Sequence, residues 1–136
     1  MIYLLDTNVV AAVLRERPFE VYSRFVRALL TPGAMGISTI TLFELWYGVA
    51  RSERPREGAE RLRLFVAGAV AIVPFEAEDA AIAGELRRTL ERAGTPIGNY
   101  DVLIAAHALR LGLTLVTANT AEFARVPGLA WEDWAA

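Results

Sequence analysis

The N-terminal segment constrains the fold of this chain more than any other stretch. Ile2 to Leu5 form an unbroken apolar run, which is followed by Asp6 and by the small polar residues Thr7 and Asn8. A short apolar run that ends at a turn signal is typical of a strand buried on both faces, as in parallel sheets. Asp6 then lies at the carboxyl end of this strand, the edge where open α/β sheets bind ligands. The segment therefore predicts a parallel sheet with an acid at its functional edge.

Apolar strand-like runs and amphipathic helical patterns alternate along the rest of the chain. The pattern predicts strands at 35–38, 70–75, 113–117 and 129–134, and helices at 8–15, 18–30, 39–51, 60–67, 76–93 and 102–111. Thr7 or Asn8 is expected to cap the first helix, and Asp101 is expected to open the last. This alternation predicts an α/β fold, with a central, mainly parallel sheet of about five strands between helical layers. At 136 residues, the chain is expected to be a single domain spanning 1–136.

The composition narrows the class of protein. Hydrophobic residues make up 54% of the chain, which argues against disorder, and the absence of cysteine excludes disulfides and thiolate metal sites. No apolar stretch is long enough to span a membrane, and the N-terminus lacks the features of a signal peptide, so we expect a cytoplasmic protein. The net charge is −2 and there is no lysine, so the chain lacks the basic footprint of many nucleic-acid-binding proteins. The missing lysine also excludes a P-loop nucleotide site and argues against a phospho-acceptor receiver domain.

Acidic residues recur where the predicted topology brings strand ends together. Asp6 ends the first strand, Glu44 lies inside an apolar helix, and Asp101 precedes a deeply apolar helix. Asn119 and Glu122 follow the strand at 113–117. Each has an ordinary alternative role as a helix cap, a solvent-facing side chain or a loop residue. Those roles do not explain why the βα order brings Asp6, Asp101, Asn119 and Glu122 to one edge of the sheet, with Glu44 on a helix that can lie over that edge.

Clustered carboxylates need a compensating charge. Two carboxylates about 5 Å apart repel each other by roughly 3 kcal/mol at an effective dielectric of 20. Hard oxygen ligands without histidine or cysteine favour Mg²⁺ or Mn²⁺ over Zn²⁺, and such an ion suits phosphodiester hydrolysis. Thr117, at the tip of its strand, is a candidate hydrogen-bond partner behind the ligands. His107, the only histidine, has no second histidine or acid at ligand spacing and is expected to have a packing or surface role.

Four stretches match one known family in order and spacing. They are YLLDTN at 3–8, ISTITLFELWYGV at 37–49, PIGNYDVLIAAHA at 96–108 and LVTANTAEF at 115–123. Together they resemble the PIN-domain ribonucleases, and specifically the VapC-type toxins of bacterial and archaeal toxin–antitoxin pairs.

The resemblance implies a PIN-like three-layer α/β/α sandwich and a Mg²⁺- or Mn²⁺-dependent endoribonuclease that cleaves structured RNA such as tRNA or rRNA. By this resemblance, the metal-binding acids are expected to be Asp6, Glu44 and Asp101. One departure is that Asn119 stands where many PIN domains have a fourth aspartate, which leaves open whether Asn119 or Glu122 completes the site and whether one or two metal ions bind. The resemblance also implies that the protein forms a homodimer and binds a partner protein, a VapB-like antitoxin.

We therefore interpret the site as follows. The catalytic set is Asp6, Glu44, Asp101 and Glu122; the metal ligands are Asp6, Asp101, Glu44 and Asn119; the supporting residues are Thr7, Asn8 and Thr117. Two alternatives remain at this point: an inactive PIN-like module that binds RNA or protein, and a metal-dependent phosphatase acting on small molecules.

Overall fold

The computed structural model describes all residues, 1–136, and contains one five-stranded sheet. The strands are β1 (Tyr3–Leu5), β2 (Met35–Ser38), β3 (Ala71–Val73), β4 (Thr114–Val116) and β5 (Trp131–Glu132). Their order in the sheet is β3-β2-β1-β4-β5, and all neighbouring strands pair in parallel. The predicted α/β class is confirmed, and the sheet is parallel throughout.

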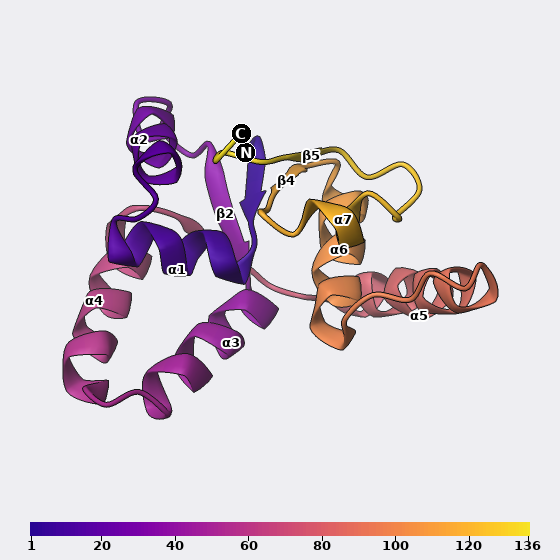
Figure 1. Cartoon of the computed structure of the whole chain (residues 1–136), viewed down its shortest axis with the longest axis horizontal. Helices are drawn as coiled ribbons and strands as arrows, with labels where there is room; N and C mark the ends of the chain where they lie inside the picture. Colours follow the sequence, from indigo (N-terminus) through magenta and orange to yellow (C-terminus); the bar gives the residue numbers. More distant parts are fainter.

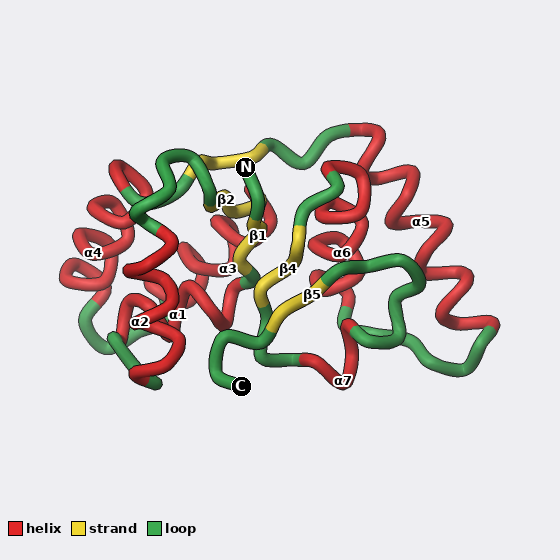
Figure 2. The backbone as a smooth tube through the Cα atoms, turned by 90° about the horizontal axis from the view of Figure 1, so that it is seen from above, coloured by secondary structure: helices red, strands yellow, loops and turns green.

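Helices cover both faces of this sheet. They are α1 (Thr7–Arg15), α2 (Phe19–Ala28), α3 (Thr39–Ala50), α4 (Pro55–Gly68), α5 (Ala77–Arg92), α6 (Asn99–Leu111) and the short α7 (Thr120–Phe123). In Figure 1, α1 to α4 lie on one side of the strands and α5 and α6 lie on the other. Figure 2, a view from above, shows the strands as the middle layer between these helical groups. The molecule is therefore a three-layer α/β/α sandwich.

The first strand divides the hydrophobic core in two. Leu4 and Leu5 are both fully buried, yet they belong to separate core clusters, because successive strand side chains point to opposite faces. Leu5 packs with residues of α1 to α4, and Leu4 packs with residues of α5 and α6. The apolar N-terminal run is thus the two-sided central strand that the sequence predicts.

Three local predictions are corrected by the structure. Asp6, and not Thr7 or Asn8, caps α1, because its carboxylate accepts the Val9 backbone N–H at 2.9 Å. The helix that contains Asp101 begins at Asn99, so Asp101 lies in its first turn and does not cap it. The helix expected from residue 60 begins at Pro55, whose fixed φ suits the first helical turn.

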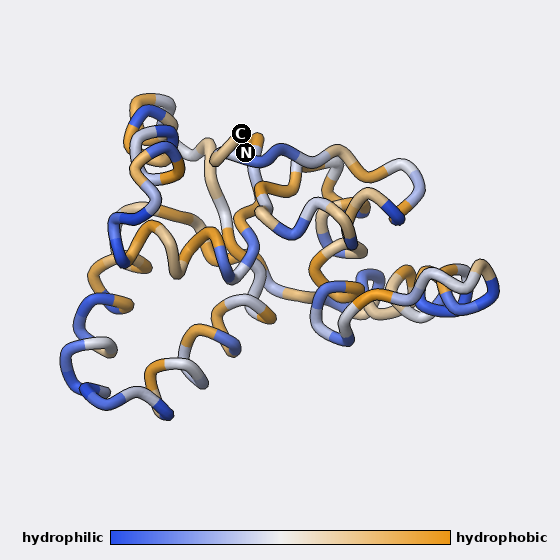
Figure 3. The backbone as a smooth tube through the Cα atoms, viewed as in Figure 1, coloured by the Kyte–Doolittle hydropathy of each residue, from blue (hydrophilic) through white to orange (hydrophobic).

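Polar side chains concentrate away from the sheet. Figure 3 shows hydrophilic residues along α5 and at the turn between α3 and α4, whereas the strands are largely hydrophobic. None of the helices combines the length and the hydrophobicity that crossing a membrane requires.

Candidate active site

The strand order gathers the predicted site residues from distant parts of the chain. β1 is central, with β2 on one side and β4 on the other, so the carboxyl ends of these three strands are neighbours. Asp6 directly follows β1, and α3, which carries Glu44, directly follows β2. Thr117 and Asn119 follow β4. Asp6, the start of α3, Thr117 and Asn119 therefore lie at neighbouring strand ends, as the βα order predicts.

Asp6 is the most deeply buried acid of this group, with 4% of its surface exposed. Burial raises the pKa of this carboxyl, and the charge of Glu44 adds to the rise. A hydrogen bond with the Thr117 side chain and backbone hydrogen bonds from Val9 and Asn8 act in the opposite direction. Asp6 thus has two roles, since it caps α1 and also places a carboxylate at the sheet edge. Asn8 contributes through its backbone, and its side chain is exposed.

Glu44 is held from behind by two threonines. The Thr7 hydroxyl donates to Glu44 Oε1 at 2.6 Å, and the Thr41 hydroxyl lies 3.4 Å from that of Thr7. Thr41 is fully buried although it is polar. Sequence reasoning missed Thr41, whose place one turn before Glu44 on the same helix was the available signal.

Asn119 bridges the remaining two acids. Its Nδ2 donates to Glu122 Oε2 at 2.8 Å and lies 3.5 Å from Asp101 Oδ2, while its backbone N–H donates to Thr117 Oγ1 at 2.9 Å. Asn119 therefore presents its amide nitrogen, and not its carbonyl oxygen, to both carboxyls. This geometry orients Asp101 and Glu122 with respect to each other.

Asp101 carries the strongest electrostatic perturbation of the site. Burial raises its pKa from 3.8 to about 7, and the hydrogen bond and charge of Glu122 and the charges of Asp6 and Glu44 contribute to the rise. The pKa of Glu122 is lowered, chiefly by its hydrogen bond with Asp101. The two opposite shifts have one cause, because a hydrogen bond between two carboxyls requires a proton on one of them, and Asp101 is the more buried partner.

The fit of a divalent ion can be judged from these donors. As they stand, no three acidic or histidine side chains are close enough to hold one ion among them. Mg²⁺ usually binds one or two carboxylates and keeps several water ligands, so it does not require a cage of three. The mutual repulsion of Asp6, Glu44, Asp101 and Glu122 supplies the electrostatic demand for a cation. The carboxylate donors therefore have the chemistry that a partly hydrated hard ion prefers, without the spacing of a preformed ion site.

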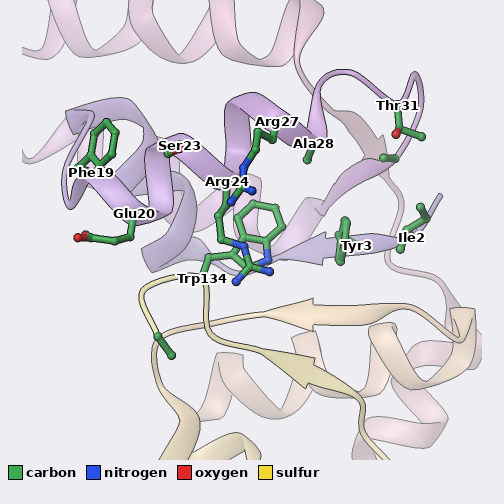
Figure 4. Close-up of a pocket in the computed structure, with 12 residues that line it drawn as sticks. Ile2, Tyr3, Phe19, Glu20, Ser23, Arg24, Arg27, Ala28, Thr31 and Trp134 are labelled. Atoms are coloured by element: carbon green, nitrogen blue, oxygen red, sulfur yellow. The ribbon is translucent and has the colours of Figure 1, made fainter.

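A cavity of about 630 Å³ lies elsewhere, between α2, the start of β1 and the C-terminal residues (Figure 4). Tyr3, Arg24, Arg27 and Trp134 are among the residues that line it, and none of the site acids does. The candidate active site is therefore identified by its side-chain chemistry and not by cavity size.

Comparison with known proteins assigns the fold to a family. The sequence profile of the PIN domain matches residues 3–129. The chain belongs to the PIN-domain family. A ribonuclease VapC2 from Rickettsia felis is 40% identical over 134 residues, which cover 98% of each chain. A tRNA(fMet)-specific endonuclease VapC from Shigella flexneri is 39% identical over 132 residues, which cover 97% of each chain.

Solved PIN-domain structures agree with this assignment. The VapBC2 complex of R. felis bound to promoter DNA contains a chain with a TM-score of 0.89 and 38% identity, with coverage of 98% of this chain and 99% of that chain. VapBC-1 from Haemophilus influenzae has a TM-score of 0.87, 34% identity and complete coverage of both chains. The resemblance to VapC-type ribonucleases is confirmed, and with it the expectation of an RNA-cleaving PIN-domain enzyme. The relatives' names favour this enzyme class over an inactive module.

Proposed function

We propose that this PIN domain is a Mg²⁺- or Mn²⁺-dependent endoribonuclease toxin that cleaves structured RNA and is neutralised by a cognate antitoxin. The observation that carries the proposal is the electrostatics of Asp101, whose pKa is raised to about 7 by burial, by its hydrogen bond with Glu122, and by the charges of Glu122, Asp6 and Glu44. A bound divalent ion would stabilise negative charge on the scissile phosphate and lower the pKa of a bound water.

The chain's own residues divide the remaining work. We assign Asp6 and Asp101 to hold the ion, and Glu44 to bind it through water or to orient the attacking water. The Thr7 hydroxyl fixes the Glu44 carboxylate through its 2.6 Å hydrogen bond. Asn119 orients Asp101, and we propose it as a donor in place of the metal ligand expected from the sequence. Such supporting hydrogen bonds commonly change metal affinity or activity by about 10- to 100-fold.

We propose tRNA as the first substrate to test and rRNA as the second. A relative with 39% identity along nearly the whole chain is named for cleavage of tRNA(fMet). The net charge of −2 provides little general attraction for RNA, so we expect selectivity to depend on local contacts and RNA shape.

The antitoxin and a homodimer belong to the same proposal. Similar chains occur in VapBC complexes from R. felis, Salmonella typhimurium and H. influenzae. Three exposed aromatic residues support a protein interface: Phe43 and Tyr47 on α3, and Tyr100 on α6. The rings of Phe43 and Tyr100 lie 5.6 Å apart and form one apolar cluster on the surface. Exposed apolar clusters of this kind usually mark protein contacts.

The proposal is tested by cleavage of purified tRNA(fMet), an elongator tRNA and an rRNA fragment, each with Mg²⁺, Mn²⁺ or EDTA. Wild-type protein should cut at defined sites only with a divalent ion. Asp6→Asn should abolish cleavage and still fold, because asparagine caps a helix about as well as aspartate does. Glu85→Gln, which neutralises an exposed acid on α5, is the matched control. Cleavage by Asp6→Asn at the wild-type rate would refute the assignment.

A further inference from the structure

A second buried polar cluster lies beside the site acids and is not explained by them. Apart from Thr41 and Thr117, which belong to the candidate active site, the fully buried polar residues are Ser38, Asp79 and His107, each 0% exposed. They come from three elements, since Ser38 ends β2, Asp79 lies in the first turn of α5, and His107 lies in the middle of α6. Buried polar groups are costly unless they are hydrogen-bonded, so their contacts require an explanation.

Ser38 and His107 form the central contact of this cluster. His107 Nδ1 lies 2.9 Å from Ser38 Oγ, although the residues are 69 positions apart in the sequence. The same Ser38 Oγ accepts the backbone N–H of Ile40 at 3.1 Å, which caps α3. One hydroxyl therefore joins the start of α3 to the middle of α6.

Asp79 lies near the other ring nitrogen of His107, Nε2. Arg110 pairs with both oxygens of Asp79, and the Glu76 backbone N–H donates to Asp79 Oδ2 at 2.7 Å. His107 Nε2 makes no hydrogen bond and lies 3.7 Å from Asp79 Oδ2. The cluster thus links α3, α5 and α6 through side chains that solvent does not reach.

These contacts favour one tautomer of the histidine. Burial lowers the pKa of His107, so the ring is neutral at pH 7. Because Ser38 Oγ already accepts from Ile40, its own hydrogen is free to donate to His107 Nδ1. In that arrangement the ring proton is on Nε2 and faces the negative Asp79, 3.7 Å away, whereas the other tautomer would point a lone pair at that carboxylate.

We propose that His107 is a positioning residue of the nuclease site, which fixes the α3 N-terminus against α6 through Ser38. This inference rests on the proposed function. α3 carries Glu44 shortly after the Ser38 cap, and α6 carries Asp101 in its first turn. The Ser38–His107 hydrogen bond therefore joins the helix of one site acid to the helix of another.

A pure packing role for His107 is the alternative explanation. An apolar side chain would fill the same space without requiring a partner, and the Phe75 ring already packs edge-on against the imidazole at 5.6 Å. The two roles predict different behaviour for substitutions that keep or remove the Ser38 contact.

The test compares His107→Asn with His107→Leu in the full chain. Asparagine can keep an acceptor near the position of Nδ1, whereas leucine retains bulk but cannot accept the Ser38 hydrogen. Leu90→Ala is the matched control, because Leu90 is a buried residue of the apolar core that α5 and α6 share and lies about three helical turns along α5 from Asp79. It reports what loss of stability alone does to the site.

Two readouts are measured on each protein. The first is the amide hydrogen exchange rate of Ile40, whose N–H donates to Ser38, followed by NMR. We expect at least tenfold faster exchange in His107→Leu and a near wild-type rate in His107→Asn and Leu90→Ala. The second is Mn²⁺ affinity by titration calorimetry, which we expect to fall about three- to tenfold in His107→Leu only, at the low end of the effects seen for residues behind metal ligands.

The outcomes separate this inference from the proposed function. If His107→Leu matches Leu90→Ala in both readouts, His107 is a packing residue and the inference fails. If wild-type protein binds no Mn²⁺, the proposed function fails, and the Ile40 exchange rate still decides whether His107 holds the start of α3. If His107→Leu does not fold, His107→Ala, which also lacks the acceptor and leaves the Ser38–Ile40 hydrogen bond available, is subjected to the same measurements.

Discussion

Neutralising Asp101 should stabilise the metal-free protein even as it abolishes activity. The pKa of this carboxyl rises from 3.8 to about 7 in the folded chain. A group whose pKa is raised by folding contributes its full stability below its unfolded pKa, and that contribution is lost as the pH rises through the folded value. Ionised Asp101 therefore destabilises the fold above pH 7, and Asp101→Asn removes this penalty.

The size of the effect follows from the pKa. At about 1.4 kcal/mol per pKa unit, the rise in the pKa of Asp101 corresponds to about 4 kcal/mol. The side chain is only half-buried, so solvent screening reduces the expected gain in free energy of unfolding to about 2 kcal/mol. With an m-value of about 2 kcal/mol per molar urea, the midpoint should shift by about 1 M.

The assay is urea unfolding in EDTA at pH 8 and pH 5, followed by tryptophan fluorescence. Asp101→Asn should be more stable than wild type at pH 8, and the difference should shrink at pH 5, where the wild-type carboxyl is protonated. Saturating Mn²⁺ at pH 8 should remove the difference in free energy of unfolding, because the ion stabilises the wild type and not Asp101→Asn. Glu85→Gln should show no comparable gain. The reasoning is refuted if Asp101→Asn gives no gain at pH 8 or an equal gain at both pH values.

Three further substitutions test the site and its surroundings. Thr7→Val removes the hydrogen bond to Glu44 and should lower kcat/KM for RNA cleavage about tenfold, while urea unfolding shows a loss of only about 1 kcal/mol. Gly98→Ala places a Cβ 3.0 Å from Asp101 Oδ2, so titration calorimetry should show weakened Mn²⁺ binding in a chain with an unchanged circular dichroism spectrum. Phe43→Asp places a charge on the exposed aromatic surface and should shift the protein from dimer to monomer in light scattering; an unchanged mass would place the dimer contact elsewhere.

Much of the fold could be read from local patterns. The apolar run before Asp6 predicts a strand buried on both faces, and Leu4 and Leu5 do belong to separate cores. Boundaries were less secure, because they depend on which side chain reaches a free backbone N–H. Asp6 reaches that of Val9, whereas a helix cap was expected from Thr7 or Asn8.

The sequence predicts which residues form the site, but it does not predict the hydrogen bonds between them. The motifs name Asp6, Glu44 and Asp101, and the βα order brings them to one edge of the sheet. The direction of the Asn119 amide, which presents its nitrogen to Asp101, could not be derived from the sequence. That direction depends on where other side chains lie in space.

His107 shows most clearly what the amino-acid sequence determined and what only the tertiary structure decided. The sequence places a lone histidine in an apolar helix without a nearby acid, which predicts a packing or surface role. Folding brings it 2.9 Å from Ser38 and 3.7 Å from Asp79, residues that are distant in the chain. Periodicity along a chain determines which residues are buried together, because burial follows the repeat of a helix or strand. Hydrogen bonds between separate elements are set by angstrom-scale positions in space, and only the packed structure supplies those.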